Sequence, residues 1–131
     1  MHITPFYAAL LGLVFFALSV RTIGLRRRLR IVLGDAGNAE MQRAMRVHAN
    51  FAEYVPLSLL LIAMFESLGG ARWLVHALCI ALVVGRLIHA SGVSRMREDF
   101  RFRVAGMSLT FVSLACAALG VLGLYALAAV G

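Results

Sequence analysis

Several hallmarks of soluble enzymes are missing from this chain. Its only two cysteines, Cys79 and Cys116, lie far apart without the spacing of a metal site, and we interpret both as small apolar packing residues. There is no zinc motif, no glycine-rich phosphate-binding loop and no recognisable Ser-His-Asp arrangement. The sequence therefore predicts no metal site and carries no motif of a nucleotide-binding enzyme or a serine hydrolase.

Polar residues are scarce as well, because 62% of the 131 residues are hydrophobic, against about half in an ordinary soluble domain. Four apolar stretches are long enough to span roughly 30 Å of hydrocarbon; they are residues 3–20, 51–68, 73–90 and 104–130. The first has no basic residue ahead of its apolar core and no cleavage pattern, so we interpret it as a retained helix. We predict an all-α integral membrane protein, a bundle of four transmembrane helices, with residues 1–131 as a single domain.

Lysine is absent, so the net charge of +7 depends entirely on arginine. Arginines gather around the first and third connections, whereas the second has one and the termini have none. By the positive-inside rule, connections one and three are expected to be cytoplasmic and both termini to face the other side. The basic charge thus indicates topology rather than nucleic-acid binding, and anionic lipid headgroups are the expected partners of residues 26–30. The arginines at these two connections are Arg21, Arg26, Arg27, Arg28, Arg30, Arg43, Arg46, Arg95, Arg97, Arg101 and Arg103.

Turn residues set the expected helix boundaries. The segment 33–38, Leu-Gly-Asp-Ala-Gly-Asn, and the pair Gly69-Gly70 are strong turn signals. We expect a first helix ending near Leu25, a second over residues 39–67, a third starting at Trp73, a connection over 92–100 and a fourth helix starting near Arg101. The small residues of the fourth helix favour close packing against its neighbours.

The second helix carries an unusual polar face. Arg46, Asn50, Glu53 and Tyr54 stand at i, i+4, i+7 and i+8, and Arg43 joins them at i−3. An unpaired charge in lipid costs several kcal/mol by most estimates, so this face must meet protein or a polar ligand. Arginine, amide and carboxylate groups suit a zwitterionic peptide, and the two carboxylates, ammonium and amides of glutathione match them. A polar network between helices is the alternative.

The third helix adds Arg86 and His89, one turn apart on one face. Arg86 either extends to the membrane interface or pairs with Glu53 inside the bundle. A packing role for His89 is favoured over a catalytic one. His48 points roughly opposite to Arg46, so a role for it as a ligand requires another subunit or helix on that side.

Arg103 stands at the start of the fourth helix. It is either an exposed topological charge or a cation at the mouth of the same cavity. Since free thiols have a pKa of about 8.5, an arginine beside a bound thiol would stabilise the thiolate and create a nucleophile.

The segment Arg46-x-x-x-Asn50-x-x-Glu53-Tyr54-x-Pro56 resembles the helix-two signature of the MAPEG family, the membrane-associated proteins of eicosanoid and glutathione metabolism. The likeness covers nearly the whole chain, including Gly85-Arg86-x-x-His89 and Arg103-Val104-Ala105-Gly106, and is greatest to small bacterial members. It implies a homotrimer with glutathione bound between neighbouring subunits near the cytoplasmic face. It further implies that Arg103 activates the thiol and that Arg46, Asn50, Glu53 and Tyr54 bind glutathione. From their places in the sequence we add four candidate glutathione-binding residues, Arg43, His48, Arg86 and His89.

From the resemblance we expect a membrane transferase or peroxidase in a bacterial inner membrane, with glutathione as co-substrate. A hydrophobic electrophile or a lipid hydroperoxide would enter from the bilayer. The alternative is a non-catalytic scaffold or lipid-binding protein that uses the polar face structurally. A small drug/proton exporter is less favoured, because the first helix has no acidic residue and Glu53 lies near the cytoplasmic edge.

Overall fold

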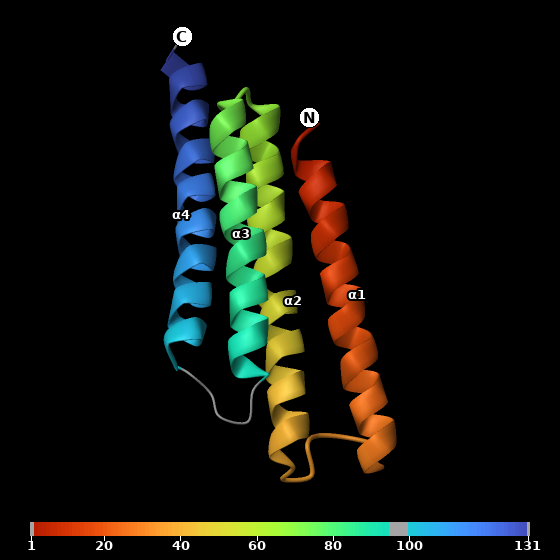
Figure 1. The fold of residues 1–131 in the computed structure, drawn as a ribbon. Coiled ribbons are helices and arrows are strands. Elements are labelled where there is room, and N and C mark those ends of the chain that lie inside the picture. The colour runs from red at the N-terminus through yellow and green to blue at the C-terminus, as the bar shows by residue number, and fades with distance from the viewer. Residues whose placement is uncertain (1, 95–99, 131) are drawn as a thin grey trace.

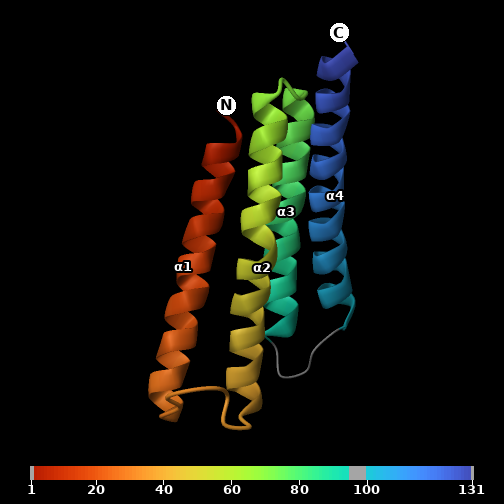
Figure 2. The same cartoon turned by 180° about the vertical axis from the view of Figure 1, so that it is seen from behind.

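The structure, a computed structural model, describes residues 2–94 and 100–130, and this part of the chain forms four helices. They run side by side in alternating directions, with both termini at the end of the bundle that holds the α2–α3 turn (Figures 1 and 2). All four are long and apolar enough to cross a membrane. The predicted four-helix membrane fold is thus confirmed. The helices are α1 (Thr4–Leu29), α2 (Ala39–Ser67), α3 (Arg72–Val93) and α4 (Phe100–Val130).

The turn between α1 and α2 lies where the sequence predicts it. Gly34 and Gly37 adopt positive φ values of 65° and 72°, which glycine tolerates without steric cost. Asn38 then caps α2, since its Oδ1 accepts a hydrogen bond from the Met41 amide at 3.0 Å. This cap fixes the start of α2 at Ala39, the predicted residue.

Two boundaries differ from expectation by more than one residue. Helix α1 continues beyond Leu25 to Leu29, because arginine is a good helix former and basic residues favour the last turn of a helix. Helix α3 includes Gly92 and Val93, which were expected to belong to the connection. Arg95 and Arg97, two of the predicted topological charges, lie outside the described residues.

The closest helix packing is between α3 and α4. A Cβ atom added to Gly106 would lie 2.7 Å from the carbonyl oxygen of Gly85 and 2.7 Å from the amide nitrogen of His89. One added to Gly92 would lie 2.7 Å from the Cβ of Phe102. Only glycine permits so close an approach of two helices. The expected close packing of α4 is therefore present at the end of the bundle where α4 begins.

Helix α1 lies at the outside of the bundle, packed on α2 and α3 (Figures 1 and 2). The carboxylate of Glu66, near the end of α2, accepts hydrogen bonds from the amides of Ile3 and Thr4 at 2.8 and 2.9 Å. It thereby caps the start of α1 from another helix. The outer faces of α1 and α4 expose large apolar side chains, as expected of lipid-facing surfaces; among these are Phe6, Leu13, Phe16, Phe111, Leu119 and Leu122.

Candidate functional site

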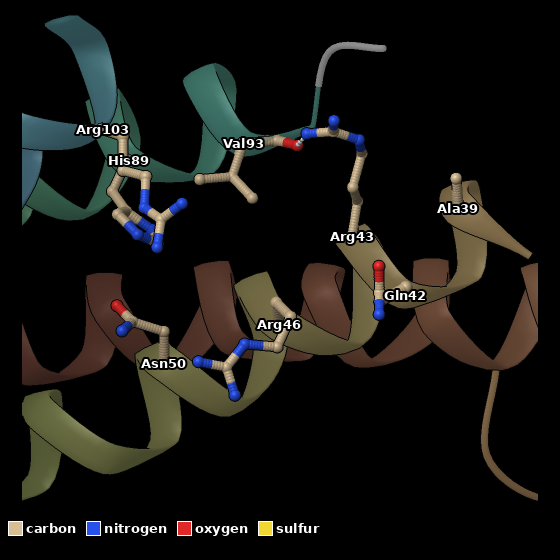
Figure 3. Close-up of a pocket in the computed structure, with 8 residues that line it drawn as sticks. All are labelled: Ala39, Gln42, Arg43, Arg46, Asn50, His89, Val93 and Arg103. Carbon is tan, nitrogen blue, oxygen red and sulfur yellow. Dashed lines mark hydrogen bonds between the residues drawn. The ribbon is translucent and has the colours of Figure 1, made fainter. Parts of the chain in front are cut away.

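A pocket of about 220 Å³ opens between α2, α3 and α4, in the half of the bundle near the α1–α2 connection (Figure 3). It brings together five of the residues that the sequence predicts as site residues, drawn from three helices. Its lining consists of Ala39, Gln42, Arg43, Arg46, Asn50, His89, Val93 and Arg103.

Helix α2 contributes one wall of this pocket. Arg43, Arg46 and Asn50 follow one another at i, i+3 and i+7, so they share a face of the helix. The Nη1 of Arg43 donates a hydrogen bond of 3.4 Å to the carbonyl oxygen of Val93 at the end of α3. The rim of the pocket is thus linked from α2 to α3.

The opposite wall comes from α3 and α4. His89 and Arg103 lie close together there, and their side chains point across the pocket toward Asn50 (Figure 3). The contact between the two helices explains this placement, because Gly106 stands one turn after Arg103 and packs against the backbone of His89. A larger residue at position 106 would push Arg103 away from α3.

The charges of the lining define what the pocket can bind. Among the residues that the structure describes, the lining contains three arginines, Arg43, Arg46 and Arg103, and no carboxylate. Each guanidinium offers a planar fork of donors that matches a carboxylate or phosphate. The arrangement is suited to an anionic ligand with more than one charged group.

Arg86 stands behind the pocket and does not line it. Its residue exposure is 1%, and its Nη1 donates a 2.6 Å hydrogen bond to Oδ1 of Asn50. Its Nη2 reaches the Gly106 carbonyl oxygen at 3.5 Å and the Met107 sulfur at 3.2 Å, while Nε has no partner among the described residues. Arg86 therefore neither extends to the interface nor pairs with Glu53, the two roles that the sequence suggested.

Three other predicted site residues lie outside the lining. Glu53 is exposed on α2, and Tyr54 stacks edge-on against Phe111 of α4, with ring centroids 5.3 Å apart. His48 faces α1, where its Nε2 lies 3.0 Å from the Ser19 hydroxyl oxygen. Within the single chain, the structure does not bring these three side chains to the pocket.

Sequence reasoning missed three lining residues. Ala39 and Gln42 precede Arg46 by seven and four positions, so the same helical spacing could have identified them. Val93 follows His89 by four positions and could have been found in the same way. The apolar and uncharged character of these residues gave no chemical signal.

Comparison with known proteins assigns the chain to a family. A model of the MAPEG family matches residues 4–125. The chain belongs to the MAPEG family. It is 37% identical over 112 residues to the inner membrane protein YecN of Escherichia coli K12, a match that covers 86% of this chain and 84% of YecN. The YecN of Escherichia coli O6:H1 gives the same figures.

Membership confirms the resemblance on which the predicted ligand set was based. The MAPEG family includes glutathione transferases and peroxidases, whereas the name of YecN states a location and no activity. The chain is therefore an integral membrane protein of a family in which glutathione chemistry is common.

Proposed function

We propose that this protein is a glutathione-dependent membrane transferase or peroxidase. The observation that carries the proposal is the pocket that groups Arg43, Arg46 and Arg103 with Asn50 and His89. Glutathione has two carboxylates, an ammonium group and two amides. Its carboxylates are the groups that arginine forks bind in a bidentate manner.

The position of Arg103 supports its assignment as the catalytic residue in this proposal. Its side chain projects into the pocket beside His89 (Figure 3). A bound thiol near this guanidinium would lose its proton more readily, because the cation stabilises the thiolate. The thiolate sulfur would then bond to an electrophilic carbon, either displacing a leaving group that departs as an anion or adding to an activated double bond whose other carbon takes up a proton. With a lipid hydroperoxide, two glutathione thiols would instead be oxidised to the disulfide while the hydroperoxide is reduced to an alcohol and water.

The pocket of one chain is smaller than most ligand sites, which measure roughly 300–1,000 Å³. The position of Glu53 indicates that a further partner completes the pocket. Phe15 of α1 stacks on Phe51 of α2 at 5.6 Å, so in this antiparallel pair Glu53 lies level with Leu13. Leu13 precedes Arg21, the first arginine of α1, by eight residues, or about 12 Å. Glu53 thus lies deeper than the position near the cytoplasmic edge that the sequence suggested, and an exposed carboxylate at that depth requires a covering partner.

A neighbouring subunit is the partner that we propose. In a homotrimer with glutathione bound between subunits, Glu53 and Tyr54 would face the interface and Glu53 would accept from the glutathione ammonium. His48 already has a partner in Ser19 and would act only indirectly. The protein would lie in a bacterial inner membrane, as YecN does in Escherichia coli, with the arginine-rich α1–α2 and α3–α4 connections on the cytoplasmic side.

A non-catalytic scaffold or lipid-binding protein is the second candidate, and one observation favours it. Asn50, a predicted glutathione ligand, already binds Arg86 of α3, so part of the polar face serves the bundle itself. This candidate predicts that Glu53→Gln lowers the stability of the oligomer with or without glutathione. The catalytic candidate predicts that the same change mainly removes the stabilisation that glutathione provides.

The decisive experiment is a glutathione titration of the detergent-solubilised protein, followed by ultraviolet difference absorbance of the thiolate. Arg103→Ala is compared with Arg101→Ala. The control removes the same charge, but Arg101 lies two residues earlier in the chain and does not line the pocket. We expect a saturable thiolate signal in the parent protein and in Arg101→Ala, and its loss in Arg103→Ala. Thermal stabilisation by glutathione should largely remain in Arg103→Ala.

An unchanged thiolate signal in Arg103→Ala would disprove the assignment of Arg103. If the folded parent protein shows no thiolate signal and no thermal stabilisation by glutathione, the catalytic proposal is disproved and the scaffold is favoured.

A further inference from the structure

A second polar pocket lies between α1 and the start of α2, apart from the site described above. It measures about 250 Å³ and is lined by Arg21, Gly24, Leu25, Arg28 and Glu40. None of these residues lines the pocket of Arg103. The family resemblance assigned no ligand to this place.

The pocket is built around two arginines of α1. Arg21 and Arg28 are seven residues apart, so they stand two turns apart on one face of the helix. Gly24 lies between them, and a Cβ atom placed there would have no neighbour within 4 Å. The missing side chain leaves an open space flanked by two guanidinium groups.

Both guanidinium groups retain free donors. Arg21 donates to the Ser94 hydroxyl oxygen through Nη1 at 2.6 Å, and Arg28 donates to both Glu40 oxygens through Nη2 at 2.7 Å. A guanidinium has five N–H groups, and the other donors of these two make no hydrogen bond within the described part of the chain. With two cations and one carboxylate in its lining, the pocket has a net positive charge.

The surface of α1 beyond the pocket shows which kind of anion fits. Leu10, Leu13, Ala17 and Val20 are exposed and apolar, and their spacing places them on the face of α1 that leads from Gly24 into the membrane. The phosphate of a phospholipid bound at Gly24 would lie at the headgroup level, and the acyl chains of that lipid would run along this strip. A free inorganic anion would leave the strip unused.

We propose that Arg21 and Arg28 form a specific site for the phosphodiester headgroup of an anionic membrane phospholipid. The sequence suggested anionic lipid headgroups as partners of residues 26–30, but Arg26 is only half-exposed and donates to protein, to the Gly34 carbonyl oxygen at 2.9 Å and to the Met45 sulfur at 3.3 Å. The site is instead a bounded pocket, and it is independent of glutathione.

The test is titration of the protein in a non-ionic detergent with phosphatidylglycerol, monitored by native mass spectrometry. Arg21→Gln removes one charged donor set and should weaken binding at least about tenfold. Gly24→Leu fills the pocket without changing any charge and should weaken it similarly. Arg27→Gln is the matched control, since Arg27 is exposed in the same helix but does not line the pocket, and it should change affinity less than about fivefold.

One variant should act in the opposite direction. Glu40→Gln removes the carboxylate that occupies Arg28, so phosphatidylglycerol should bind up to about fivefold more tightly. A misfolded protein would not show this gain. Phosphatidylcholine, whose headgroup has no net charge, should bind at least about tenfold more weakly than phosphatidylglycerol.

Three results would overturn the proposal. Equal losses in Arg21→Gln and Arg27→Gln would indicate general electrostatic attraction, and unaltered binding in Gly24→Leu would show that the pocket is not used. Finally, if inorganic phosphate displaces phosphatidylglycerol at equal concentration, and its binding depends on Arg21 in the same way, the site belongs to a free anion.

Discussion

The hydrogen bond between Asn50 and Arg86 allows the most direct test of the structure. Asn50→Ala removes the acceptor of the 2.6 Å bond and leaves a guanidinium that is 1% exposed. The remaining contacts of Arg86 are weak, because the Gly106 oxygen lies 3.5 Å away and the Met107 sulfur, at 3.2 Å, is a poor acceptor. The substitution therefore leaves a buried cation poorly paired.

The expected cost depends on which effect dominates. Hydrogen bonds between membrane helices contribute about 0.6 kcal/mol on average and about 1.7 at most, because the unfolded chain in the membrane also finds partners. Bonds to charged groups contribute about 1.5–3 kcal/mol, and an uncompensated buried charge costs more. Since Arg86 is charged and buried at the contact of α3 and α4, we expect Asn50→Ala to destabilise the fold by about 1.5–3 kcal/mol.

A double-mutant cycle separates the bond from the loss of the Asn50 side chain itself. Arg86→Met replaces the cation by an apolar side chain, and Asn50→Ala in that background should cost less than about 1 kcal/mol. The free energy of unfolding is measured by titration with sodium dodecyl sulfate in mixed micelles. A coupling energy below about 0.5 kcal/mol between the two substitutions would refute the inference that Asn50 holds Arg86 inside the bundle.

Two further predictions concern packing and capping. Gly106→Ala should cost about 1–3 kcal/mol, because its Cβ would lie 2.7 Å from backbone atoms of α3, whereas Gly123→Ala, with no neighbour within 4 Å, should be neutral or slightly stabilising in the same titration. Glu66→Ala should accelerate hydrogen exchange at the start of α1, because the Glu66 carboxylate accepts hydrogen bonds from backbone amides there. Ser67→Ala, which loses only a hydrogen bond within its own helix, should not. Equal effects within either pair of variants would contradict the corresponding contact.

The architecture was predictable because its signals are local. The bounds of α2 follow from Asn38 at one end and Gly69 at the other, and both act on the backbone within a few residues. Long apolar runs predicted the four spans without knowledge of their neighbours. The end of α1 was misplaced because the arginines after Leu25 are equally compatible with a helix and with a polar connection.

The contents of the pocket were only partly predictable. Helical spacing grouped Arg46, Asn50, Glu53 and Tyr54, but it could not show which flank of that face meets α3 and α4. The bond from Asn50 to Arg86 joins residues 36 positions apart and depends on how two helices cross. Such a contact has no periodic signature in the sequence.

Arginine fulfils roles here that lysine would fulfil less well, which gives the absence of lysine a physical meaning. Arg86 bonds an amide oxygen while its second terminal nitrogen approaches a carbonyl on α4, and this requires a planar group that branches. Arg21 donates to the hydroxyl of Ser94, the residue that follows α3, and keeps donors for a phosphate. An ammonium is a compact and strongly hydrated point charge, so it would be costlier to bury and would lack this fixed fork. Arg86→Lys should therefore be a disruptive change in this bundle, although it conserves the charge.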